Sequence, residues 1–88
     1  MTTAMTQVRL HYWAGARAAA GVEEDTITAS TVAEALAAAA AARPDQRFAK
    51  ILSGCSLLLD GRALHPADLD RHLDGPVVVE ILPPFAGG

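Results

Sequence analysis

Apolar and polar positions alternate clearly in the first part of the chain. Residues 8–13 have a period of two, which predicts a half-buried strand with Val8, Leu10 and Tyr12 on its inner face. Residues 24–29 are rich in β-favouring side chains and predict a second strand that runs into a serine. Both segments are short, as expected for strands of a small sheet.

Two further apolar runs occur in the second half. Residues 57–59 are three leucines followed by Asp60-Gly61, which predicts a strand entering a tight turn, because Asp-Gly favours positive φ. A second Asp-Gly turn is predicted at Asp74-Gly75, after a crossing segment with a leucine pair. Residues 77–82 are interrupted only by Glu80, and this pattern predicts a central strand buried on both faces.

Helical signals lie between these strands. Residues 14–20 predict a short alanine-rich helical turn that ends at Gly21, a residue suited to a C-cap. Thr31-Val32-Ala33-Glu34 has the form of a capping box and predicts the start of a longer helix, which Pro44 stops. The strongest side of this helix is expected to carry Val32, Leu36 and Ala40. Residues 45–52 have apolar side chains at helical spacing and predict another short helix.

The order of these elements predicts an α+β fold of the β-grasp (ubiquitin-like) type, a small mixed sheet with one main helix packed across it. In that arrangement the first and last strands pair in parallel at the centre of the sheet. Periodicity gives the elements but does not give that pairing. We expect residues 1–82 to form the domain and residues 83–88 an extended C-terminal tail.

Composition limits the kinds of function. The chain has 88 residues, and its hydrophobic fraction of 51% is largely alanine, so the core is small and no large internal pocket is expected. The net charge is −3 without a basic stripe, which argues against nucleic acid or an anionic membrane as partner. A single cysteine, Cys55, excludes an internal disulfide and fits a reducing compartment. No membrane-spanning run or signal peptide is visible, and we expect a cytoplasmic protein.

The last six residues carry the candidate chemistry. Pro83 and Pro84 fix φ and favour an extended chain, Phe85 and Ala86 follow, and residues 87–88 are glycines. Six extended residues reach roughly 20 Å, enough to carry a carboxylate into another protein's narrow active site. The alternative is an ordinary solvated terminus.

Taken together, several segments resemble the MoaD/ThiS family of small sulfur-carrier proteins. The matching segments are residues 8–17, residues 31–36, residues 73–75 and, above all, Glu80-Ile81-Leu82-Pro83-Pro84-Phe85-Ala86-Gly87-Gly88. The Pro-Pro-x-x-Gly-Gly ending is more similar to MoaD, the small subunit of molybdopterin synthase, than to ThiS. The chain departs from the family pattern at Pro76, and in a longer turn through His65-Pro66.

The resemblance implies a chemistry at the C-terminus. A MoeB-like adenylating enzyme would use ATP to form an acyl-adenylate on Gly88, and a persulfide sulfur donor would convert it to a thiocarboxylate. A MoaE-like large subunit would then use that sulfur to build the dithiolene that binds molybdenum. The chain would bind no cofactor or metal and would not be an enzyme on its own. A carrier for thiazole or cysteine synthesis and a ubiquitin-like protein modifier are the alternatives.

The expected roles of individual residues follow from this chemistry. Gly87 and Gly88 would thread a narrow slot, and Pro83 and Pro84 would reduce the entropy lost on insertion. Phe85 would anchor in a partner pocket, with Ala86 beside it, unless it folds back on its own domain. Leu82 and Trp13 would add an apolar docking patch, for which ordinary packing on the sheet is the alternative.

Other candidate groups carry less weight. Cys55 lies among apolar residues and is interpreted as a packed thiol. The three histidines (His11, His65 and His72) share no metal-ligand spacing and are expected to be exposed. Residues 23–25 are acidic and are expected to form a solvated loop.

Overall fold

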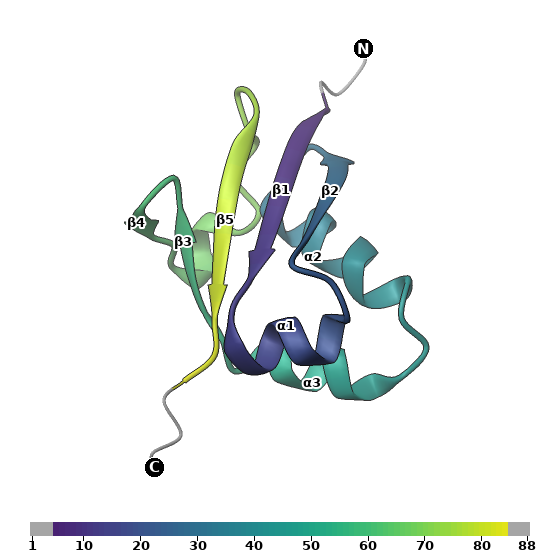
Figure 1. Ribbon diagram of the computed structural model, residues 1–88. Helices are drawn as coiled ribbons and strands as arrows, with labels where there is room; N and C mark the ends of the chain where they lie inside the picture. The colour runs from purple at the N-terminus through teal and green to yellow at the C-terminus, as the bar shows by residue number, and fades with distance from the viewer. Residues whose placement is uncertain (1–4, 85–88) are drawn as a thin grey trace.

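A mixed five-stranded sheet forms one layer of the structure, a computed structural model that describes residues 5–84 (Figure 1). The strands are β1 (Thr6–Tyr12), β2 (Glu24–Ala29), β3 (Ser56–Leu59), β4 (Arg62–Ala63) and β5 (Val77–Leu82), in the order β2-β1-β5-β3-β4. Strands β1 and β5 pair in parallel at the centre, and the other pairs are antiparallel. The predicted β-grasp arrangement is confirmed, including the pairing that periodicity could not give.

The helices cover one face of this sheet and leave the other open. They are α1 (Ala14–Ala20), α2 (Val32–Ala41), α3 (Gln46–Ser53) and the short 3-10 helix η1 (Pro66–Asp68). In Figure 1, α2 lies behind the sheet, and α1 and α3 lie together at the end where β1 and β5 finish. Strand β5 therefore ends on the same side of the domain as these two short helices.

Local signals set the boundaries of the elements. Helix α1 ends at Gly21, whose φ of 81° is the left-handed conformation that glycine adopts without strain. The turn after β3 has Asp60 at φ 48° and Gly61 at φ 88°, as Asp-Gly predicts. Gly75, by contrast, does not have positive φ, so the second predicted Asp-Gly turn is only a bend in the loop before β5.

The start of α2 differs slightly from the predicted capping box. The Thr31 hydroxyl accepts from the Glu34 backbone N–H at 3.1 Å, as expected. The Glu34 carboxylate, however, reaches one residue further back and accepts from the backbone N–H and the hydroxyl of Ser30. These bonds hold the pKa of Glu34 below its usual value of 4.5.

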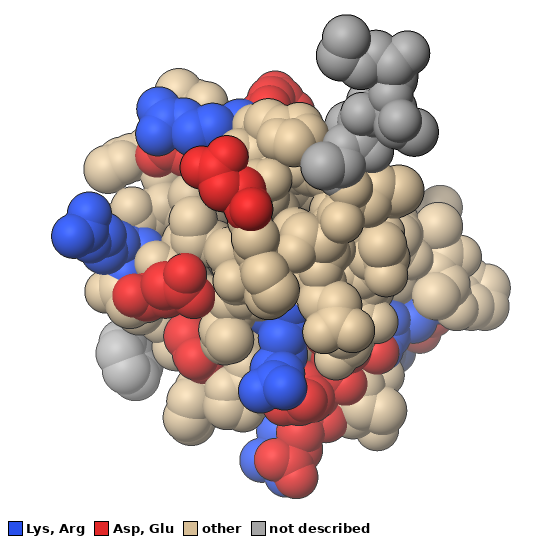
Figure 2. Space-filling view, turned by 90° about the horizontal axis from the view of Figure 1, so that it is seen from above, with Lys and Arg blue, Asp and Glu red and all other residues tan. Residues whose placement is uncertain are grey.

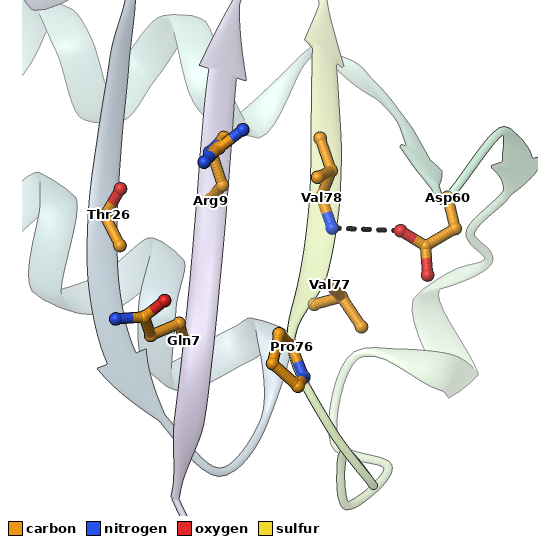
Figure 3. A pocket seen from close by; sticks show the side chains of 7 residues that line it. All are labelled: Gln7, Arg9, Thr26, Asp60, Pro76, Val77 and Val78. Carbon is orange, nitrogen blue, oxygen red and sulfur yellow. Dashed lines mark hydrogen bonds between the residues drawn. The ribbon is translucent and has the colours of Figure 1, made fainter.

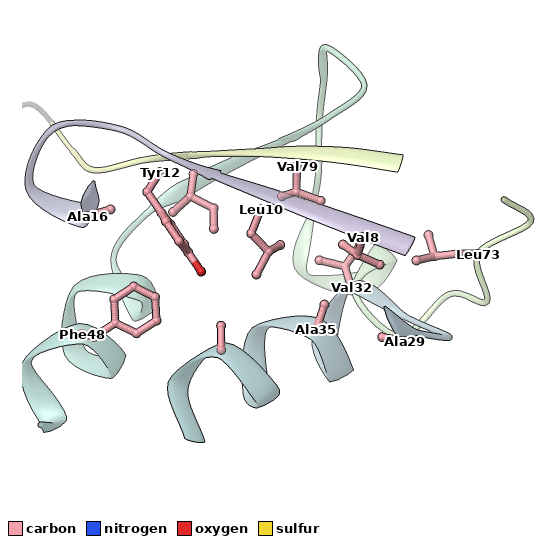
Figure 4. Close-up of a cluster of buried hydrophobic side chains, with 12 residues drawn as sticks. Val8, Leu10, Tyr12, Ala16, Ala29, Val32, Ala35, Phe48, Leu73 and Val79 are labelled. Carbon is pink, nitrogen blue, oxygen red and sulfur yellow. The ribbon is translucent and has the colours of Figure 1, made fainter. Parts of the chain in front are cut away.

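The core lies between the closed face of the sheet and the helices (Figure 4). Its members are fully or almost fully buried: Val8, Leu10, Tyr12, Ala16, Ala29, Val32, Ala35, Ala39, Phe48, Leu73, Val79 and Ile81. The rings of Tyr12 and Phe48 meet edge to face with centroids 5.4 Å apart. Alanines at the helix surface let α2 approach the sheet closely, so a small core fills without large side chains.

The predicted inner side of α2 is partly wrong. Val32 is buried as expected, but Ala35 and Ala39 complete the buried line, and Leu36 and Ala40 are only half-buried. The latter two face a groove beside β3 and α3. Close packing on the sheet favours the small side chains of Ala35 and Ala39 on the buried line over the larger side chain of Leu36.

Strand β5 is central, but the prediction that both its faces are buried is wrong. Val79 and Ile81 point into the core, whereas Val78, Glu80 and Leu82 remain half-buried on the open face. Side chains of the neighbouring strands β1 and β3 cover part of the open face of β5, so apolar residues are tolerated there. Helices cover only the closed face.

The acidic run at residues 23–25 is also not a uniform solvated loop. Asp25 is half-buried and accepts from the Tyr12 hydroxyl at 2.7 Å and from Arg43 at 2.9 Å. Arg43 further donates to the carbonyls of Ala20 and Ala39, and its guanidinium lies 4.6 Å from the centre of the Phe48 ring. One arginine after α2 therefore ties α1, α2, α3 and β2 together. Burial raises the pKa of Tyr12, and the hydrogen bond to Asp25 adds to the shift.

Candidate functional site

The root of the tail is built where the two central strands end. Because β1 and β5 are parallel, their carboxyl ends lie at the same end of the sheet. Tyr12 pairs with Ile81, and the backbone N–H of Trp13 donates to the Ile81 carbonyl at 3.1 Å. On its other side, Leu82 pairs with Ser56 at the start of β3. Strand β5 is therefore held by β1 as far as Ile81 and by β3 as far as Leu82, directly before the prolines.

The structure brings the predicted docking residues Trp13 and Leu82 to this end of the sheet. Trp13 follows β1 and is 45% exposed, an unusual fraction for the largest side chain of a small domain. Leu82 and Pro83 are half-buried, and Pro84 is exposed. The other four predicted site residues, Phe85, Ala86, Gly87 and Gly88, lie outside the described residues.

A polar cluster beside Trp13 was missed in the sequence. The Trp13 indole N–H and the His11 Nδ1 both contact Glu80 Oε1, the latter at 2.8 Å. The His11 and Trp13 rings are 4.7 Å apart. His11 is therefore half-buried and not exposed as expected, whereas His65 and His72 are exposed. The parallel register places His11 opposite Glu80, and only the single acid in an apolar strand hinted at this.

A small hollow occupies the opposite end of the open face (Figure 3). It has a volume of about 170 Å³ and lies among side chains of β1, β2 and β5, with Arg9 and Asp60 as its charged groups. The Asp60 carboxylate accepts from the Val78 backbone N–H at 3.0 Å, so this side chain completes the ladder at the turn. Arg9 pairs with Glu24 at 3.5 Å. Both charged groups thus have structural partners within the domain.

Cys55 borders an open groove of about 630 Å³ lined mainly by apolar side chains of α2, α3, β3 and the segment after it. Its thiol donates to the Ile51 carbonyl at 3.1 Å, and burial raises its pKa. A raised pKa lowers the fraction of thiolate, the form that reacts with sulfur donors. These properties fit the interpretation of a packed thiol.

Charge and metal-binding potential are modest in the part of the chain that the structure describes. Residues 5–84 contain no cluster of three or more His, Cys, Asp or Glu side chains that could hold a metal ion. Basic and acidic side chains are interspersed on the face seen in Figure 2. None of the helices within residues 5–84 has the length and apolar character needed to cross a bilayer. The candidates for a functional site are therefore the C-terminal tail and the end of the sheet at which β5 finishes.

Comparison with known sequences identifies the family. Residues 10–88 match the sequence model of the ThiS family, which is nearly the whole chain. The chain belongs to the ThiS family. No curated protein sequence matches it significantly.

Several solved structures have a similar fold. Small archaeal modifier protein 1 from Methanosarcina acetivorans superposes with a TM-score of 0.77 at 23% identity, over 97% of this chain and 99% of that one. The protein of the same name from Haloferax volcanii gives 0.75 at 20% identity, over 93% and 99%. A chain in the complex of subunits 1 and 2 of the molybdopterin-converting factor from Helicobacter pylori gives 0.65 at 21% identity, over 93% and 99%.

At these identities the superpositions show the fold. This ThiS-family chain has the ubiquitin-like β-grasp fold of small sulfur carriers and modifiers over its full described length.

Proposed function

We propose that this ThiS-family chain is the sulfur-carrier small subunit of molybdopterin synthase, with the sulfur held as a thiocarboxylate on Gly88. The observation that supports the proposal most strongly is the position of the tail root. The Pro-Pro-x-x-Gly-Gly segment begins directly after β5, the central strand, which pairs with β1 as far as Ile81 and with β3 as far as Leu82. A rigid base and a narrow tail suit a terminus that several enzymes must reach.

The chemistry follows from the weakness of a carboxylate as electrophile. A MoeB-like enzyme would transfer AMP from ATP to the Gly88 carboxylate and release pyrophosphate. The terminal sulfur of a persulfide would attack the acyl carbon, form a C–S bond and displace AMP, which gives an acyl disulfide. A thiol would then cleave the S–S bond that the persulfide brought with it, forming a disulfide with the donor cysteine and releasing the thiocarboxylate. The product is a thiocarboxylate, which is ionised at neutral pH and nucleophilic through sulfur. A MoaE-like large subunit would hold the pterin precursor that receives it.

In this scheme the chain is substrate and carrier, and its partners perform catalysis. Gly87 and Gly88 offer no Cβ to a narrow channel. Trp13 and Leu82, which follow the last β1–β5 pair at the same end of the sheet, would form the apolar docking patch. The packed environment of Cys55 supports the terminus, rather than this thiol, as the sulfur-bearing group.

Intact mass spectrometry tests the proposal directly. After incubation with ATP, a MoeB-like enzyme and a persulfide donor, one terminal oxygen is expected to be replaced by sulfur. Deletion of Gly88 is expected to abolish this change and leave the thermal unfolding midpoint unaltered. Gly75→Ala is the matched control, because Gly75 lies before the other end of β5 and an added Cβ there meets no atom within 4 Å. An unchanged mass under conditions that thiolate an established carrier would refute the proposal.

A ubiquitin-like modifier is the second candidate, since the fold of small archaeal modifier protein 1 spans 97% of this chain. Both functions begin with the same adenylate and differ in the nucleophile that follows. A modifier would form an isopeptide with a target lysine, which appears as a ladder of larger conjugates containing this chain. A molybdopterin synthase subunit would instead form a stable, non-covalent complex with a MoaE-like protein on size-exclusion chromatography.

A further inference from the structure

Glu80 is an unusual residue for its position on the open face of the sheet. It lies on the central strand β5, between half-buried Val78 and Leu82, and pairs with Leu58 on one side and His11 on the other. Its side chain is only 28% exposed. A carboxylate placed among apolar neighbours loses hydration and normally needs a compensating partner.

Within the domain that compensation is incomplete. Both donors, His11 Nδ1 and the Trp13 indole N–H, contact the same oxygen, Oε1. Among residues 5–84, no hydrogen bond or ion pair reaches Oε2. The two contacts fix the orientation of the carboxylate and leave its second oxygen as an acceptor.

Four arginine side chains of the domain already form ion pairs with other acidic side chains. Arg9 pairs with Glu24, Arg17 with Glu23, Arg43 with Asp25, and Arg71 with Asp68. In the described residues Glu80 has no lysine or arginine partner, and its side-chain contacts there are with His11 and Trp13. A protein that covers this face would therefore bury a carboxylate without a fixed countercharge, unless it supplies a cation itself.

The indole of Trp13 beside Glu80 favours an arginine over a lysine as the partner cation. Its ring is held by the same carboxylate and remains 45% exposed beside it. A guanidinium can donate to a carboxylate oxygen and stack on an indole at the same time, whereas an ammonium is a strongly hydrated point charge. We propose that Glu80 and Trp13 together form the receptor for an arginine side chain of the enzyme that adenylates Gly88.

This inference rests on the proposed function, because it assigns the occupant of the docking surface next to the tail. Six residues separate the end of β5 from the terminus, and they span roughly 20 Å when extended. An enzyme that holds Gly88 in its active site therefore has that site within roughly 20 Å of the end of β5, a distance that its surface can span to reach Glu80. Adenylation is the first step that the terminus undergoes, so its enzyme is the partner to test.

Kinetics of ATP–pyrophosphate exchange catalysed by the MoeB-like enzyme provide the test. Glu80→Gln keeps Oε1 as an acceptor for His11 and Trp13 but removes the negative charge. It is expected to raise the KM for the carrier about tenfold with kcat unchanged, and to weaken the dependence of KM on salt. Glu24→Gln is the matched control, since it removes the same charge one strand away, opposite His11. Its KM is expected to stay within about twofold of the wild type.

The identity of the cation is tested by protection from chemical modification. Phenylglyoxal modifies arginine, and one arginine of the adenylating enzyme is expected to be protected by the wild-type carrier and not by Glu80→Gln. Protection of a lysine from acetylation in place of an arginine would overturn the assignment.

The two proposals fail in different ways. Normal exchange with equal KM values for wild type and Glu80→Gln would overturn the arginine receptor alone. Absence of exchange with the wild type, with an enzyme active on its own carrier, would overturn the proposed function and this inference with it.

Discussion

The two faces of the central strands differ sharply although they share the same backbone. On the closed face, Val8, Leu10 and Val79 are completely buried under the helices. On the open face, Arg9, His11 and Glu80 alternate with them along the same strands and retain contact with solvent. Neighbouring residues thus serve different purposes, because successive side chains in a strand point to opposite sides. The closed face stabilises the domain, and the open face keeps polar side chains accessible to a partner.

The largest effect is expected from substitutions on the closed face. Leu10→Ala removes a fully buried side chain from the centre of the sheet and is expected to lower the free energy of unfolding by about 2–5 kcal/mol. Arg9→Ala, one residue away on the open face, is expected to change it by no more than about 0.5 kcal/mol. Urea denaturation of both variants measures the difference. Equal losses would show that the two faces contribute alike, contrary to the comparison.

A smaller loss of stability is expected when Asp25, which accepts hydrogen bonds from Tyr12 and Arg43, is removed. Asp25→Ala leaves the Tyr12 hydroxyl and the Arg43 guanidinium without their shared acceptor and is expected to cost about 1–3 kcal/mol. Glu24→Ala is the adjacent control, because its ion pair with Arg9 is exposed at both ends. Thermal unfolding of the two variants compares them. A Glu24 variant as unstable as the Asp25 variant would refute the special role of the network.

Tyr12 provides a test of the same network through pH. Its pKa is raised above the usual 10.0, so the neutral phenol stabilises the fold fully below pH 10 and this contribution is lost as the pH rises beyond it. Tyr12→Phe is expected to cost about 1 kcal/mol at neutral pH, from the hydrogen bond to Asp25. It should also remove part of the alkaline loss of stability. Because Tyr12 is the only tyrosine, its ionisation can be followed by ultraviolet absorbance without assignment. Ionisation at the ordinary value would contradict its burial.

The smallest effect on stability is expected at Glu34, an exposed residue in the first turn of α2. The Glu34 pKa is depressed, so the stabilisation by its carboxylate is present above the usual value of 4.5 and is lost as the pH falls through the depressed pKa. Glu34→Gln is therefore expected to flatten the acid limb of the stability curve. Asp45→Asn, at the cap of α3, serves as the control for removing an exposed capping acid. An identical acid limb in the wild type and Glu34→Gln would show that the Ser30 contacts add nothing.

Local patterns predicted the elements well because their causes are local. The bounds of α1, β2 and β5 agree with the residues expected, and the glycines at 21 and 61 have the positive φ that their positions require. The predictions of side-chain surroundings failed at Asp25 and His11, whose partners are distant in the chain. Asp25 binds Arg43, and His11 meets Glu80, only because the strands and helices come together in one particular register.

The sequence by itself determined the elements, the family resemblance and the candidate chemistry of the terminal glycines, because these depend on residue types and short spacings. The tertiary structure alone decided which face of β5 is open, which side of α2 is buried, and that Trp13, His11 and Glu80 meet beside the tail root. The physical reason is that parallel pairing joins strands 65 or more residues apart, and no local pattern records that register.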